Sequence, residues 1–211
     1  MRKKFLLCLA ALLALWGIGT TAAAAPAPGL GSYLQVTGYD PQTDYMDAME
    51  RAVAALESAG RIDLYGLGNS GIIAMDAELK LQRIGCNARS ALDGHRQAIC
   101  AATLDKGDVV MLFSYYGETR DLLEALDIAK GRGATTIAVT RVGKSSLSTR
   151  ADIVLSVASM EQLTRSGAMT SRLVMLNMVD MLFTCISSRQ YDQVRPVLER
   201  TAQAIHDKRR G

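Results

Sequence analysis

The chain has 211 residues, of which 49% are hydrophobic and 5% aromatic, and this composition is typical of one compact α/β domain. Its formal charge is +3, and without Arg2, Lys3 and Lys4 the basic and acidic residues balance at 21 each. A neutral body excludes a large basic surface, so we expect no direct binding of nucleic acid.

Residues 1–25 resemble a secretory leader. A basic start precedes the apolar run Phe5–Ile18, and small residues at Ala22–Ala25 could be cleaved. The run is short for a membrane span, so the leader would be the protein's sole link to a membrane. We therefore expect an exported, periplasmic protein. A retained anchor or a mis-set start codon, with a cytoplasmic protein, is the alternative. Residues 26–42 then form a linker, and residues 43–211 form the domain.

Buried strands alternate with amphipathic helices along the domain. The pattern predicts strands at 61–65, 87–92, 109–113, 134–139 and 152–157. It predicts helices at 43–58, 72–84, 94–103, 118–130, 170–187 and 192–208, with a polar loop at 141–148. This alternation is typical of a parallel sheet with helices on both faces. Met175, Met178 and Met181 recur every three residues and are expected in the core or at an oligomer seam.

Cysteine usage points away from a metal centre. Beyond the leader the chain keeps Cys86, Cys100 and Cys185, an odd number without a C-x-x-C pair. This pattern favours buried thiols over a disulfide framework or a metal site, so we expect no metal and no cofactor.

Ser114-Tyr-Tyr-Gly-Glu-Thr119 follows the most strongly apolar strand, at the point where a helical pattern begins. The carboxyl ends of parallel strands are where open α/β sheets bind ligands. A helix start offers N–H groups and partial positive charge to an anion, and this loop contains no Lys. The alternative is that Ser114 or Thr119 simply caps the helix.

Gly66-Leu-Gly-Asn-Ser-Gly71 is a second loop of this kind after the first strand. A dinucleotide loop is a weak interpretation, because Gly71 comes one residue early for G-x-G-x-x-G and no well-placed acidic residue ends the second strand. A tight turn without a ligand is another. We favour a phosphate or sugar site with Ser70 as donor, because both loops can face one crevice.

Together these two loops resemble the sugar isomerase (SIS) domain. Further segments resemble the SIS domain of the RpiR/MurR family of transcriptional regulators: Asp93-Gly-His95-Arg-Gln97, Ala134–Thr140, Ala151-Asp152 and Thr170–Phe183. The resemblance runs from about Asp44 to the C-terminus. It implies a three-layer αβα sandwich with a five-stranded parallel sheet, a bound phosphorylated sugar or amino sugar, and a homodimer or homotetramer.

The resemblance also implies a set of ligand-binding residues. Asn69 and Ser70, with Gly68, would contact the sugar from the first loop. Ser114, Gly117 and Thr119 would hold the phosphate in the second. Tyr116 stands where the family usually has a second hydroxyl, and its phenol could still donate a hydrogen bond. Where family members carry an N-terminal helix-turn-helix, this chain has the leader and linker, so we expect no DNA-binding domain.

Weaker candidates are the residues that could carry proton chemistry. His95 follows the second strand and Glu161 follows the fifth, where SIS isomerases often place a carboxylate. For each, a structural or solvated side chain is the commoner case. Glu118 is suited to a first helical turn without any chemistry, and Arg172 could meet an anion or a partner carboxylate.

The sequence thus predicts a phosphosugar-binding SIS domain, without assigning it an enzymatic activity. One alternative is an aldose–ketose phosphosugar isomerase using Glu161 or His95. The other is an oligomerising family remnant that binds no ligand.

Overall fold

The computed structural model describes residues 43–159 and 168–206. Its strands form one five-stranded parallel sheet in the order β2-β1-β3-β4-β5. The strands are β1 (Ile62–Gly66), β2 (Ala88–Ala91), β3 (Val109–Phe113), β4 (Thr135–Arg141) and β5 (Ile153–Val157). The α/β fold with a five-stranded parallel sheet is confirmed.

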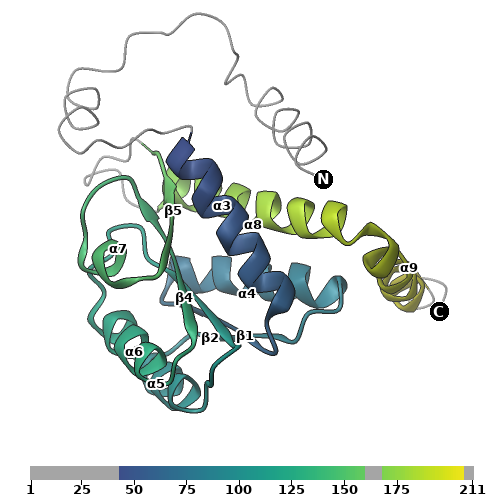
Figure 1. Cartoon of the computed structure of the whole chain (residues 1–211). Helices are drawn as coiled ribbons and strands as arrows, with labels where there is room; N and C mark the ends of the chain where they lie inside the picture. The colour runs from purple at the N-terminus through teal and green to yellow at the C-terminus, as the bar shows by residue number, and fades with distance from the viewer. Residues whose placement is uncertain (1–42, 160–167, 207–211) are drawn as a thin grey trace, which may run out of the picture.

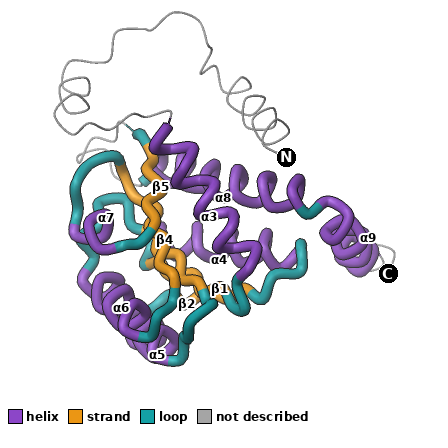
Figure 2. Tube along the Cα trace, viewed as in Figure 1, coloured by secondary structure: helices purple, strands orange, loops and turns teal. Residues whose placement is uncertain are grey.

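Helices cover both faces of this sheet (Figure 1). One face carries α3 (Thr43–Ser58), α4 (Asn69–Arg83) and α8 (Met169–Arg189). The other carries α5 (Gly94–Ala102), α6 (Arg120–Gly131) and α7 (Ser146–Arg150). The last helix, α9 (Tyr191–His206), packs beyond the end of α8, as the tube in Figure 2 shows.

The strands have two buried faces because successive side chains point to opposite sides. In β3, for example, Val109, Met111 and Phe113 enter the core under α3, α4 and α8, whereas Val110 and Leu112 enter the core under α5 and α6. All five side chains of β3 are buried. The unbroken apolar run in the sequence therefore predicted the strand at its correct position.

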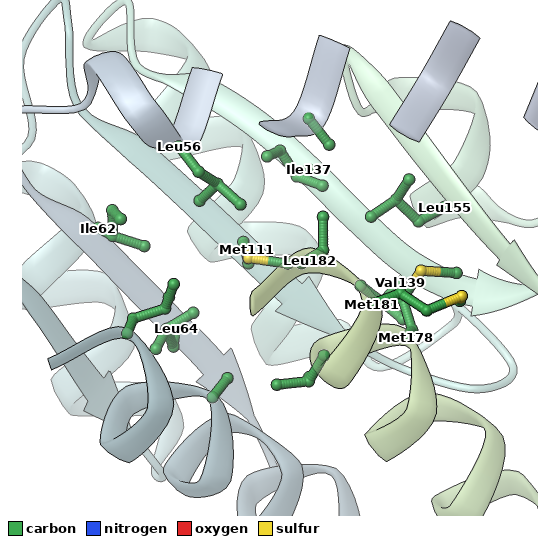
Figure 3. Packing of buried hydrophobic residues seen from close by; sticks show 14 of the residues in the cluster. Leu56, Ile62, Leu64, Met111, Ile137, Val139, Leu155, Met178, Met181 and Leu182 are labelled. Carbon is green, nitrogen blue, oxygen red and sulfur yellow. The ribbon is translucent and has the colours of Figure 1, made fainter. Parts of the chain in front are cut away.

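The larger core is built around α8. Its Met178, Met181 and Leu182 meet side chains of β1, β3 and β4 (Figure 3). Met175, Met178 and Met181 are all buried, so this series belongs to the core. By length and composition alone, α8 is also the one helix of the described residues apolar enough to cross a membrane. Its packing against α4, α3 and β5 is that of a core helix.

Three boundaries differ from the sequence prediction in ways that matter for function. Helix α4 begins at Asn69, three residues before the predicted start at Ile72. Helix α6 begins at Arg120, so Glu118 lies before the helix. Residues 141–148, predicted as a loop, contain the last residue of β4 and the first turn of α7.

Candidate functional site

The candidate site lies at the carboxyl ends of the neighbouring strands β1 and β3. Gly66 at the end of β1 pairs with Phe113 at the end of β3, so the loops that follow leave the sheet side by side. Helix α4 then covers one face of the sheet and α6 the other. This is the switch point of a doubly wound sheet, the place where such folds bind ligands. The structure therefore brings the two predicted loops together.

The loop after β3 is organised by the Ser114 hydroxyl. Its Oγ accepts a hydrogen bond from the Gly117 N–H at 3.1 Å and lies 3.1 Å from Thr119 Oγ1. Ser114 is only 5% exposed, whereas Thr119 is partly exposed. Two hydroxyl protons are present and the Ser114–Thr119 bond uses one of them. The pair can therefore donate the other proton to a ligand.

Thr119 is also the N-cap residue of α6, yet its side chain makes no capping hydrogen bond. The N–H groups in the first turn of a helix have no partner within the helix. They carry a partial positive charge that favours an anion. The β3–α6 loop thus presents hydroxyl and N–H donors to the same place, and the capping alternative for Thr119 is not what the structure shows.

The loop after β1 is tightly folded against the strand it leaves. A side chain at Gly66 would come within 2.8 Å of the Gly71 nitrogen, so the first turn of α4 packs directly on the strand end. Gly68 is the N-cap residue of α4 and provides no side-chain cap. Gly68 and Asn69 are exposed and Ser70 is partly exposed. These three predicted residues lie at a second uncapped helix start beside the first.

Gln97 of α5 ties this loop to the sheet. Its side chain is fully buried, and Nε2 donates to the carbonyls of Gly66 at 3.2 Å and Ala91 at 2.9 Å. The amide therefore fixes the ends of β1 and β2 relative to each other. The sequence analysis quoted Gln97 for its family resemblance but assigned it no role.

Helix α7 holds the β3–α6 loop from the other side. The Leu147 N–H donates to the Gly117 carbonyl at 3.0 Å. Gly117 has φ 69°, and a Cβ there would lie 2.7 Å from Ser145 Cβ. Only glycine fits this combination of left-handed backbone and close approach. The loop therefore requires glycine at position 117, and contact of Gly117 with a ligand stays a prediction.

Glu118 is engaged with α7 and takes no part in the α6 helix start. Its carboxylate accepts from the Ser146 N–H at 2.8 Å and from the Ser146 hydroxyl at 2.6 Å. These two hydrogen bonds hold the pKa of Glu118 below its ordinary value, and the nearby charges of Arg150 and Arg141 lower that pKa further. The Glu118 side chain thus links the β3–α6 loop to α7.

The Tyr116 side chain is 42% exposed at the middle of the same loop. Its ring meets Tyr115 edge to face, with 5.1 Å between the ring centroids. Arg141 Cζ lies 5.1 Å from the Tyr116 centroid on the ring face. Tyr116 thus brings a cation to the loop, and its contact with a ligand stays a prediction.

The residues considered for proton chemistry are not gathered at these loops by any contact of the described chain. His95 is exposed in the first turn of α5. Arg172 is partly exposed in the first turn of α8. Glu161 lies outside the described residues. Within residues 43–159 and 168–206 no cluster of three His, Cys, Asp or Glu side chains is placed to hold a metal ion.

Sequence reasoning assigned no role to three residues that shape the candidate site: Gln97, Ser145 and Arg141. Ser145 and Ser148 form a capping box at the start of α7, and the Ser-x-x-Ser spacing could have indicated it. Arg141 ends β4 at the carboxyl edge of the sheet, and only the order of the strands brings it to the loop after β3.

Comparison with known proteins identifies the family. The SIS domain matches residues 55–185. An HTH-type transcriptional regulator of Caldanaerobacter subterraneus is 41% identical over 159 residues, which cover 75% of this chain and 56% of that protein. The chain therefore spans little more than half of that relative.

Solved structures of SIS domains share the fold of this chain. The Vibrio vulnificus NanR protein complexed with ManNAc-6P is 25% identical with a TM-score of 0.73, over 84% of this chain and 66% of that one. The sugar isomerase domain of an RpiR transcription factor from Sphaerobacter thermophilus shares the fold, at 24% identity and a TM-score of 0.68, over 82% and 98% of the two chains. The chain therefore belongs to the SIS domain family and corresponds to the SIS part of RpiR-type regulators.

Proposed function

We propose that this chain binds a phosphorylated sugar or amino sugar and acts as an effector-sensing domain of the RpiR type. The observation that carries the proposal is the Ser114–Thr119 hydroxyl pair at the uncapped start of α6, directly beside the uncapped start of α4. The NanR structure, which contains ManNAc-6P, supports the chemical class of the ligand.

The two loops would contact different parts of the ligand. The phosphate would accept the available hydroxyl proton of the Ser114–Thr119 pair and the N–H groups in the first turn of α6, which favour negative charge. The sugar hydroxyls would meet Asn69 and Ser70, whose amide and hydroxyl can both donate and accept. Ligand binding would then order the loops and shift the packing between subunits.

A thermal-shift panel tests the proposal. Sugar phosphates, including ManNAc-6P, should raise the melting temperature, because a ligand at 100 times its Kd adds about 2.7 kcal/mol to the free energy of unfolding. Neutral N-acetylmannosamine should do far less. Thr119→Val should remove most of the shift, since valine keeps the shape of threonine without its hydroxyl. No shift from any sugar phosphate would overturn the proposal.

Self-association is part of the same proposal. Apolar side chains remain exposed along α4 and at the start of α8: Ile72 49%, Met75 46%, Leu79 63%, Met169 68% and Leu173 57%. Exposed apolar surface of this kind marks interaction sites. We expect a homodimer or homotetramer by light scattering, and Leu79→Glu should shift the mass toward the monomer. A monomeric wild-type chain would contradict this.

The proposed ligand and the relatives support one cellular location. The relative from Caldanaerobacter is a transcriptional regulator, which favours the cytoplasmic alternative over export. We therefore propose that the protein senses its ligand in the cytoplasm, without contacting DNA through residues 43–211. Mass spectrometry of the N-terminus tests this, because a mature start near Ala25 would show cleavage and export instead.

A further inference from the structure

Arg141 is placed by the sheet beside the phosphate-binding loop. It is the last residue of β4, the strand next to β3. Its N–H donates to the Tyr115 carbonyl at 3.0 Å, and the Thr140 hydroxyl donates to the same oxygen at 3.1 Å. Because Tyr115 directly follows Ser114, the backbone of Arg141 is fixed to the loop.

The Tyr116 ring contacts the Arg141 side chain, and Tyr115 packs against Tyr116. The guanidinium lies on the face of Tyr116, 5.1 Å from Cζ to the ring centroid. Tyr116 in turn meets Tyr115 at an interplanar angle of 81°. The Tyr115 hydroxyl donates to the Ser159 carbonyl at 2.7 Å, which anchors the stack to the chain after β5. A cation on an aromatic face keeps its N–H edge available to other groups.

The guanidinium has not been neutralised by the surrounding residues. Among the described residues Arg141 makes no ion pair, whereas Arg132 and Arg150 each pair with an aspartate. The Arg141 charge helps to lower the pKa of the Glu118 carboxyl, whose two oxygens both accept hydrogen bonds from Ser146. Arg141 is therefore a positioned cation without an ion pair to any described residue, in a loop whose donors suit an anion.

We propose that Arg141, held in place by Tyr116, is a specificity-determining residue that pairs with the phosphate of the ligand and selects its dianionic form. This inference rests on the proposed function. The β3–α6 loop supplies only neutral donors, which would not distinguish strongly between phosphate charge states. Because the second phosphate pKa is about 6, pairing with Arg141 makes binding tighter at pH 7 than at pH 5.

The test is isothermal titration with ManNAc-6P at pH 5 and pH 7. Arg141→Gln should weaken binding about tenfold at pH 7, in line with a charge-assisted hydrogen bond, and should flatten the pH dependence. Tyr116→Leu should weaken binding by about the same factor. The double variant should bind no more than about twofold worse than either single variant, because the two side chains act as a unit. Rising salt should reduce wild-type affinity more than that of Arg141→Gln.

Arg83→Gln is the matched control. It removes the same charge from an exposed residue at the far end of α4 and should leave affinity within about twofold. If Arg141→Gln binds like the wild type while Thr119→Val does not, the Arg141 inference falls and the proposed function stands. If neither the wild type nor any variant binds a sugar phosphate, both fall.

Discussion

The four helices that start in loops at the carboxyl edge of β1 to β4 begin in two different ways. In α5, the Asp93 side chain accepts from the Arg96 N–H at 2.9 Å, and in α7 Ser145 and Ser148 form a capping box. At the starts of α4 and α6, Gly68 and Thr119 make no side-chain capping bond. The two uncapped starts are those that flank the switch point between β1 and β3.

At the start of α6 this difference leaves N–H donors for a ligand, whereas at the start of α4 the Ser70 and Gly71 N–H groups donate to the Leu67 and Gly68 carbonyls. A side-chain cap stabilises a helix by about 1 kcal/mol relative to alanine, so α6 gives up a readily available stabilisation, whereas a glycine N-cap such as Gly68 costs α4 only about a few tenths of that. Thr119 could act as a cap by residue type, yet its hydroxyl pairs with Ser114 instead. The capped helices α5 and α7 then serve as supports, through Gln97 and through Leu147 and Ser146.

Gly117→Ala should produce the largest loss of stability and binding, because it forces the β3–α6 loop away from α7. An alanine there would adopt a left-handed backbone and push against Ser145, at a combined cost of about 2–4 kcal/mol. Urea unfolding should show this loss, and binding of a sugar phosphate should disappear.

Gly107→Ala is the control for that experiment. Gly107 also has a positive φ, of 95°, but a Cβ there would meet nothing within 4 Å. Its cost should be that of the backbone alone, about 1 kcal/mol, with binding retained. Equal losses at both positions would mean that contact between Gly117 and Ser145 is unimportant.

A pair of variants separates the two kinds of helix start. Asp93→Ala removes the cap of α5 and should lower the free energy of unfolding by about 1 kcal/mol, with affinity changed less than about twofold. Thr119→Val should weaken phosphosugar binding about tenfold or more and lower stability by less than about 1 kcal/mol. Urea midpoints and titration calorimetry on both proteins measure these effects. If Thr119→Val loses only stability, the start of α6 is a structural feature like that of α5.

The sequence predicted the strands well because all-buried strands leave an unbroken apolar run, as in Val109–Phe113. It placed the start of α4 too late. Gly68, Asn69 and Gly71 have poor helix propensity, and the pattern therefore predicted a turn. In the structure, close packing of this turn on Gly66 makes it helical, and such packing is a tertiary effect.

The site was predicted only in part for a related reason. Residues that follow a strand directly, such as Ser114, could be assigned to the ligand edge from the local pattern. Arg141 reaches the loop only because β4 lies next to β3, and α7 is too short at Ser146–Arg150 to show a helical period. Contacts between segments distant in the chain were thus the part that periodicity could not supply.

The smallest predicted effect concerns the Glu118–Ser146 hydrogen bonds, which link the β3–α6 loop to α7. The pKa of the Glu118 carboxyl lies below its ordinary value of 4.5, because Ser146 donates two hydrogen bonds to it. A carboxyl whose folded-state pKa is lowered stabilises the fold above its unfolded-state pKa, and that stabilisation is lost as pH falls through the folded-state pKa. Glu118→Gln should therefore unfold at lower urea than the wild type at pH 7.

The same difference should shrink as the pH falls below 4.5, since the wild-type carboxyl then becomes protonated and resembles the amide. Glu124→Gln, at an exposed position of α6, controls for the loss of one negative charge. A gap between Glu118→Gln and wild type that stays constant from pH 7 into acid would show that the carboxylate charge does not hold the loop. The support for the ligand loop would then come from the Leu147–Gly117 backbone bond and from packing at Ser145 alone.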